Sequence, residues 1–74
     1  MFIYLKNQES NENILIDINE VVFIQYKKPL DNDSLNNITI VFKNTITAKA
    51  LILDSELARF LSYLDDKESI IGSL

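Results

Sequence analysis

Residues 38–64 have the sequence ITIVFKNTITAKALILDSELARFLSYL, and this stretch decides the fold class. Apolar and polar side chains alternate over 38–43 and again over 45–53, which is typical of strands with one buried face. The connection between the two runs is too short for anything but a tight hairpin. We expect Asn44 to take the left-handed conformation that such a turn needs. The first part of the stretch therefore predicts a β-hairpin.

The end of the same stretch predicts an amphipathic helix. Asp54 or Ser55 can cap its N-terminus, and Glu56 places negative charge at the positive end of the helix dipole. Apolar residues then recur at i, i+3, i+4 and i+7, namely Leu57, Phe60, Leu61 and Leu64. This stripe can pack on a sheet. Arg59 lies off it and is expected to pair locally with Glu56 or Tyr63, with the anchoring of a partner as the alternative.

Three more runs with strand character come before the hairpin, at residues 2–6, 13–18 and 20–27. Pro29 has no N–H to donate, so the third run ends before it. We therefore expect one α+β domain over residues 1–69, a small antiparallel β-meander of four to five strands followed by one C-terminal amphipathic helix. Residues 70–74 form an apolar C-terminal tail, for which a sixth strand, a docking segment and disorder all remain open.

Composition limits the classes of function. The 74 residues include 7 Lys and Arg against 11 Asp and Glu, a net charge of -4, which argues against a nucleic-acid partner. Cys and His are both absent, which fits a reducing compartment and removes the commonest metal ligands and general base. No apolar run approaches the ~20 residues that span a bilayer, and the first residues lack the basic flank of a secretory signal. We expect a cytoplasmic protein with no membrane partner.

The sequence offers no recognisable reaction site. No Gly-rich phosphate loop can exist with one glycine, and no serine lies in a nucleophile elbow. Asp31 and Asp33 begin a segment like a calcium loop, but Leu35, Asn36 and Phe42 occupy positions where that loop requires other residues. We therefore expect no enzyme, no catalytic residue, no cofactor and no bound metal.

Residues 13–64 resemble the opening half of LytTR-type DNA-binding domains, with ILIDINEVVFIQ followed by a loop, NITIVFKN and a capped helix. That resemblance implies DNA binding. The basic and His residues of the further β segment in that family have no counterpart here, and DNA binding would contradict the net charge. No family is assigned.

The strands carry apolar residues on both faces, although one helix can cover only one face. The expected inner set is Ile14, Ile16, Ile18, Val22, Ile24, Ile40, Phe42 and Ile52. The residues out of phase with it form the predicted self-association face, Leu15, Val21, Phe23, Val41 and Leu51. Such a face is covered by a second copy, most often in a symmetric dimer, by curling of the sheet, or by another protein.

The acidic side chains suggest a second surface. A predicted acidic partner face consists of Asp31, Asp33, Asp65, Asp66 and Glu68. The leading hypothesis is a small, non-enzymatic, acidic protein-interaction module that forms homodimers through its sheet and has a regulatory or structural role. The alternative is an acidic inhibitor from a phage or mobile element that occupies a basic, nucleic-acid-binding surface of a host protein.

Overall fold

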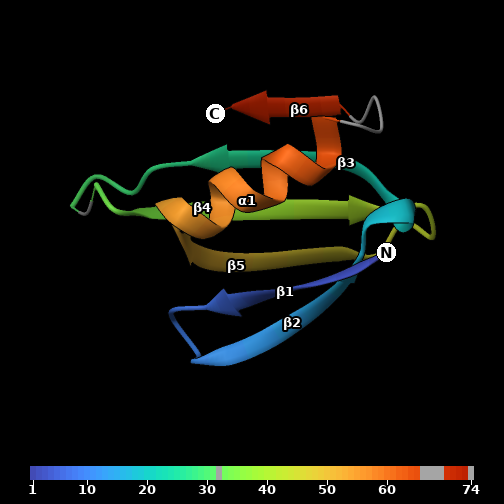
Figure 1. Ribbon diagram of the computed structural model, residues 1–74. Helices are drawn as coiled ribbons and strands as arrows, with labels where there is room; N and C mark the ends of the chain where they lie inside the picture. Colours follow the sequence, from blue (N-terminus) through green and yellow to red (C-terminus); the bar gives the residue numbers. More distant parts are fainter. Residues whose placement is uncertain (32, 66–69, 74) are drawn as a thin grey trace.

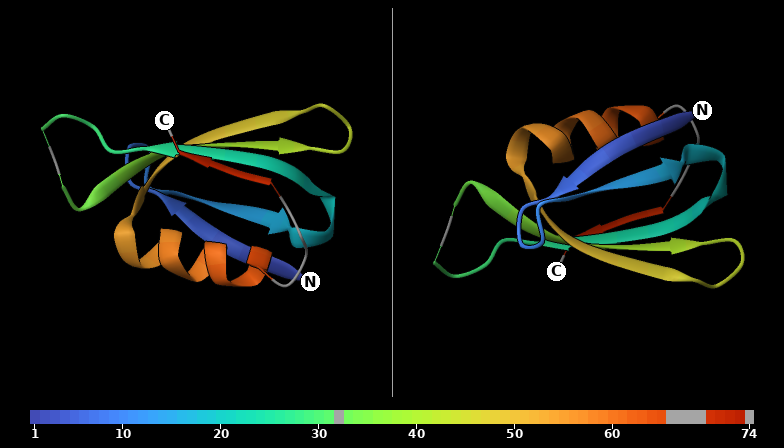
Figure 2. Two further views of the ribbon diagram at one scale, coloured as in Figure 1. Left: turned by 90° about the horizontal axis from the view of Figure 1, so that it is seen from above. Right: turned by 90° about the horizontal axis from the view of Figure 1, so that it is seen from below.

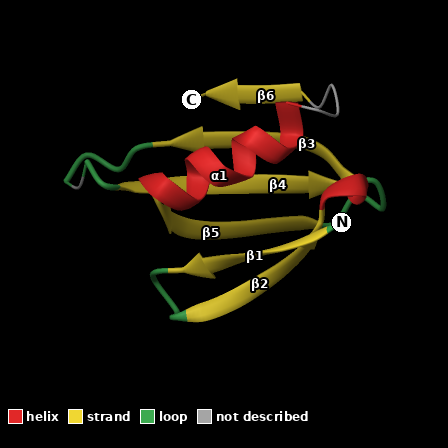
Figure 3. Ribbon diagram, in the orientation of Figure 1, coloured by secondary structure: helices red, strands yellow, loops and turns green. Residues whose placement is uncertain are grey.

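The computed structural model describes residues 1–31, 33–65 and 70–73. Its elements follow one another as β1 (Phe2–Asn7), β2 (Glu12–Asp17), the short 3-10 turn η1 (Ile18–Glu20), β3 (Val21–Lys27), β4 (Leu35–Phe42), β5 (Thr47–Leu53), α1 (Asp54–Asp65) and β6 (Ile70–Ser73) (Figure 1; Figure 3). The predicted α+β class is confirmed, and each predicted strand and the helix are present close to the expected bounds.

The expected single meander is divided into two sheets. β1 and β2 form an antiparallel hairpin, whereas the second sheet has the strand order β5-β4-β3-β6. The division occurs at η1, where the chain leaves β2 and enters β3 without pairing these two strands. Residues 70–73 add β6 to this sheet, parallel to β3, so the sixth strand is the alternative that the structure shows for the apolar tail.

The core lies between the two sheets and the helix. Figure 2 shows α1 and the β1–β2 hairpin on the same side of the four-stranded sheet. The core residues are Ile3, Leu5, Ile16, Ile18, Val21, Ile24, Ile38, Ile40, Ala50, Ile52, Leu57, Phe60 and Leu64. Burial of each large apolar side chain contributes roughly 1.5–3 kcal/mol, so a set of this size can hold a short chain together.

A β-bulge at the start of β3 reverses the predicted burial of Val21 and Val22. Val21 pairs with Phe42 and Phe23 pairs with Val41, so Val22 is an extra residue on this strand. Val21 is therefore 6% exposed and belongs to the core, whereas Val22 is 43% exposed. The prediction placed Val22 inside and Val21 on the self-association face, and both assignments are wrong.

The β4–β5 turn also differs from expectation. The residue with positive φ is Thr45, at 68°, and not Asn44. The Thr45 N–H donates to the Phe42 carbonyl oxygen over 2.9 Å, and the Ile46 N–H donates to Asn44 Oδ1 over 3.1 Å. A three-residue loop of this kind is a type I turn followed by a left-handed residue, so the strained position falls one residue later.

Candidate functional site

Side chains of α1 cover the outer edge of β1. The Lys6 N–H donates to Glu56 Oε2 over 2.9 Å, and Arg59 Nη2 donates to the Tyr4 carbonyl oxygen over 2.6 Å. The expected local pairing of Arg59 is therefore wrong, because its side chain crosses to β1. Both bonds involve backbone groups on the side of β1 away from β2. The N–H and C=O groups of Tyr4 and Lys6 therefore point away from β2.

The outer edge of β5 is blocked at its middle by the β1–β2 turn. The Gln8 N–H donates to the Leu51 carbonyl oxygen over 2.6 Å, and the Leu51 N–H donates to Asn7 Oδ1 over 3.1 Å. The same Oδ1 accepts the Glu9 N–H over 3.1 Å. Asn7 therefore holds the turn closed and joins the hairpin to the second sheet.

β2 has an open outer edge in the described part of the chain. Tyr4 pairs with Leu15, and Lys6 with Asn13. In an antiparallel pair both residues point their backbone groups the same way relative to the partner strand, so Leu15 and Asn13 point theirs away from β1. Within the described residues, no hydrogen bond uses these outward groups, and β1 is the sheet neighbour of β2 (Figure 1).

An apolar patch adjoins this open edge. Phe2, Tyr4 and Leu15 lie on the outer face of the hairpin, with exposed fractions of 64%, 61% and 55%. We call these three residues the hairpin patch. Sequence reasoning assigned Leu15 to a binding face but missed Phe2 and Tyr4, because both faces of β1 are apolar and alternation alone does not say which is buried.

The predicted self-association face does not form one surface. Leu15 lies on the hairpin, and Val21 is buried in the core. The other three, Phe23, Val41 and Leu51, are half-buried on the outer face of the four-stranded sheet. Across that face runs a row of polar residues that separates Leu51 from the adjacent Phe23 and Val41. The row consists of Gln25, Thr39 and Lys49 on neighbouring strands.

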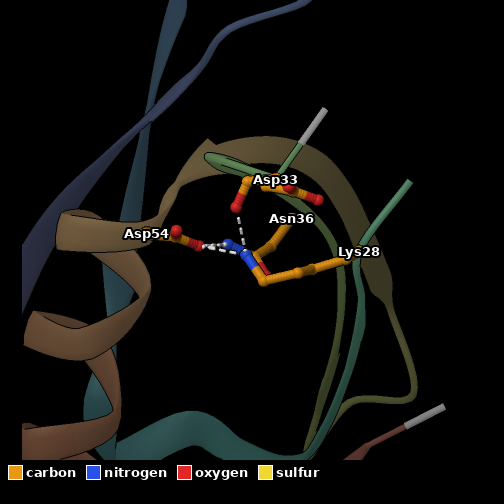
Figure 4. Close-up of polar contacts among 4 residues, drawn as sticks. All are labelled: Lys28, Asp33, Asn36 and Asp54. Carbon is orange, nitrogen blue, oxygen red and sulfur yellow. Dashed lines mark hydrogen bonds and ion pairs between the residues drawn. The ribbon is translucent and has the colours of Figure 1, made fainter. Parts of the chain in front are cut away.

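A polar cluster connects the β3–β4 loop to the start of α1 (Figure 4). Lys28 Nζ donates to Asp54 Oδ1 over 2.7 Å and to the Asp33 carbonyl oxygen over 2.5 Å. Asn36, which is 2% exposed, donates its Nδ2 hydrogen to the same Asp54 oxygen over 2.5 Å. The hydrogen bond from Lys28 first, and that from Asn36 second, lower the pKa of the Asp54 carboxyl below its ordinary value of 3.8. The geometry is that of a structural clamp on the loop.

The acidic partner face is distributed over the molecule. Asp31 and Asp33 are exposed in the β3–β4 loop, which lies at the end of the molecule where α1 begins (Figure 1). Asp65 ends α1, at the opposite end, and Asp66 and Glu68 fall outside the described residues. The structure therefore places the two loop members at one end of the molecule and Asp65 at the other.

A shallow hollow of about 310 Å³ lies beside the β1–β2 turn. It is lined by Asn7, Glu9, Asn37, Ile38, Thr39, Lys49, Ala50 and Leu51. Among the described residues, no buried side-chain nitrogen or oxygen lacks a hydrogen-bond partner.

Comparisons with known proteins add no further assignment. No family model, curated protein or solved structure matches the chain, and the likeness to LytTR-type domains is not supported by a family match. Within the described ranges, no group of three or more His, Cys, Asp or Glu side chains is arranged to hold a metal ion. Helix α1 is too short and too polar to cross a membrane. The open edge of β2 and the hairpin patch are therefore the candidate site.

Proposed function

We propose that this protein is a small, non-enzymatic protein-interaction module that associates with itself through its strands and has a regulatory or structural role. The observation that carries the proposal is the hairpin patch beside the open edge of β2. Apolar side chains and unpaired backbone groups occur there together, and each favours contact with another chain.

The contrast with the outer edges of β1 and β5 supports a binding role for the outer edge of β2. Glu56 and Arg59 cover the edge of β1, and the turn at Asn7 and Gln8 covers the middle of the edge of β5. Exposed edges in proteins are usually blunted by charges, proline or bulges. In the middle of β2, the residue whose backbone groups point outward is instead the apolar Leu15, which is 55% exposed.

The non-enzymatic part of the proposal rests on composition. A chain of 74 residues without His or Cys has few groups that can act as a base or nucleophile near neutral pH. The ion pairs of Lys28 with Asp54 and of Lys43 with Glu20 involve exposed side chains and join neighbouring loops and elements. They support a structural use of these charges.

The test is the molar mass measured by light scattering on a size-exclusion column over a wide range of protein concentrations. We expect the mass to rise from that of the 8.5 kDa chain toward twice this value as concentration increases. A mass that stays at 8.5 kDa up to millimolar concentration would overturn self-association.

A further inference from the structure

We propose that two copies of this chain pair through the outer edges of β2, antiparallel and centred on Leu15. The two hairpins then form one four-stranded sheet with the order β1-β2-β2-β1 across a twofold axis. This inference rests on the proposed self-association and specifies which surface carries it and in which register.

The backbone groups on the outer edge of β2 point toward the position of such a neighbouring strand. Asn13 and Leu15 point their N–H and C=O groups outward, as the bonds of Lys6 and Tyr4 to α1 establish for the paired strand. When a strand meets its own copy antiparallel, the residue at the centre faces itself and exchanges two hydrogen bonds with it. The N–H and C=O groups of Leu15 point outward, as this central position requires.

The side chains favour this register over those centred on Asn13 or Asp17. With Leu15 at the centre, Asn13 lies opposite Asp17 of the second copy, so an amide faces a carboxylate. Centring on Asp17 would place two carboxylates opposite each other. Centring on Asn13 would place Leu15 opposite Asn11, which has a φ of 62° and lies outside the strand. Of the registers centred on Asn13, Leu15 and Asp17, the Leu15 register places Leu15 against Leu15 and avoids like charges.

Charge complementarity across the pair supports a second copy as the occupant. On the outer face, Lys6 lies opposite Asn13, which in turn lies opposite Asp17 of the second copy. In its own chain this carboxylate accepts the Asn19 N–H and lies 3.8 Å from the Met1 amino group, so Lys6 would add a second cation to it. A lysine can reach a carboxylate over a short intervening side chain, and the symmetry repeats this contact on the other side of the axis. The centre of the sheet then carries Tyr4 and Leu15 from each copy in one apolar row.

The inner face is consistent with the same pairing. Ile16 is buried, whereas its neighbour on this face, Ile14, is only half-buried. In the Leu15 register, Ile14 lies beside Ile16 of the second copy. Pairing therefore extends the apolar layer of one chain into that of the other.

Disulfide trapping tests the register directly, because the chain has no cysteine of its own. In the predicted pair the two Leu15 Cα atoms are about 5.5 Å apart, which a disulfide can span. We expect Leu15→Cys to form a covalent dimer rapidly under mild oxidation. Asn13→Cys alone should not, because the two copies of this residue are about 13 Å apart along the strands. A mixture of Asn13→Cys and Asp17→Cys should give the mixed dimer.

Charge substitutions distinguish dimerisation through the edge of β2 from dimerisation through another surface. We expect Leu15→Lys to raise the dimer dissociation constant at least about tenfold, because two cations would face each other at the centre. Ile46→Lys is the matched control, since Ile46 is 62% exposed in the β4–β5 turn, which belongs to the four-stranded sheet and not to the hairpin. Val41→Lys tests the outer face of the four-stranded sheet. Far-UV circular dichroism and thermal melting confirm that each variant is folded.

The outcomes distinguish the inference from the proposed function. Trapping at Leu15 together with loss of dimer in Leu15→Lys alone supports the β2 pair. A dimer that survives Leu15→Lys but dissociates in Val41→Lys overturns the β2 inference and leaves self-association standing. A wild-type chain that remains monomeric at every concentration overturns both.

Discussion

Arg59 Nη2 donates a hydrogen bond to the Tyr4 carbonyl oxygen over 2.6 Å and so joins the helix to the first strand across 55 positions of sequence. Together with the bond from the Lys6 N–H to Glu56, it occupies the edge of β1 that β2 does not use. Because one edge of the hairpin is closed in this way, its open edge in the described part of the chain is that of β2. The helix therefore determines both the packing of the core and the direction in which the hairpin can be extended.

Replacement of this arginine should weaken the hairpin measurably. We expect Arg59→Ala to lower the free energy of unfolding by about 1 kcal/mol, since one hydrogen bond to a charged donor is lost at an exposed site. Lys49→Ala removes the same charge from β5, where the lysine side chain makes no hydrogen bond or ion pair with another described residue. It should change stability by less than about 0.5 kcal/mol. Urea unfolding at constant pH compares the two variants. Equal effects would show that net charge, and not the contact with Tyr4, is responsible.

The clamp at Asp54 predicts a loss of stability in acid. Its pKa in the folded chain lies below 3.8, mainly through the hydrogen bond from Lys28, so protonation is easier in the unfolded chain. The contribution of this carboxylate is complete above pH 3.8 and is lost as the pH falls through the folded value. In Lys28→Met, NMR titration of the Asp54 carboxyl should give a pKa closer to 3.8. An unchanged pKa in that variant would exclude Lys28 as the main cause.

The left-handed Thr45 predicts a stabilising substitution. A β-branched residue with a φ of 68° costs roughly 1–2 kcal/mol relative to an extended one, and glycine carries no such cost. Part of the gain is offset by the greater freedom of glycine in the unfolded chain. We expect Thr45→Gly to raise stability by about 1 kcal/mol and the melting temperature by roughly 4–8 °C. Thr47→Gly in β5 should instead be destabilising, which makes it a control for glycine as such.

Periodicity was sufficient to predict β1 to β5, α1 and most of the core. Ile16, Ile24 and Ile52 are buried as the alternation predicted, and α1 buries Leu57, Phe60 and Leu64 from its stripe. These predictions succeed because a strand or helix with one buried face repeats its apolar residues at the period of its backbone. The agreement is not complete even in regular strands, since Ile14 and Phe42 were predicted to be inside and are half-buried.

Predictions failed where the backbone departs from regularity or where long-range contacts decide. The pair Val21-Val22 carries no composition signal for a bulge, so the phase of β3 could not be read there. The contact of Arg59 with Tyr4 depends on how the hairpin folds against the helix, which local spacing does not encode. For the candidate site, the sequence identified Leu15 and not its neighbours Phe2 and Tyr4, because apolar residues occur on both faces of β1.

The junction at Asn7 should be the most sensitive polar position of the hairpin. Its Oδ1 accepts two backbone N–H groups, from Glu9 in the turn and from Leu51 in β5. We expect Asn7→Ala to lower the free energy of unfolding by about 1–3 kcal/mol, because a partly buried donor on β5 would lose its partner. Asn44→Ala is the control, since its Oδ1 accepts a single N–H in an exposed turn and should cost about 1 kcal/mol or less. Amide exchange gives the second readout. The Leu51 amide should exchange faster in Asn7→Ala, whereas unchanged exchange there would show that the two sheets are held together by the apolar core alone.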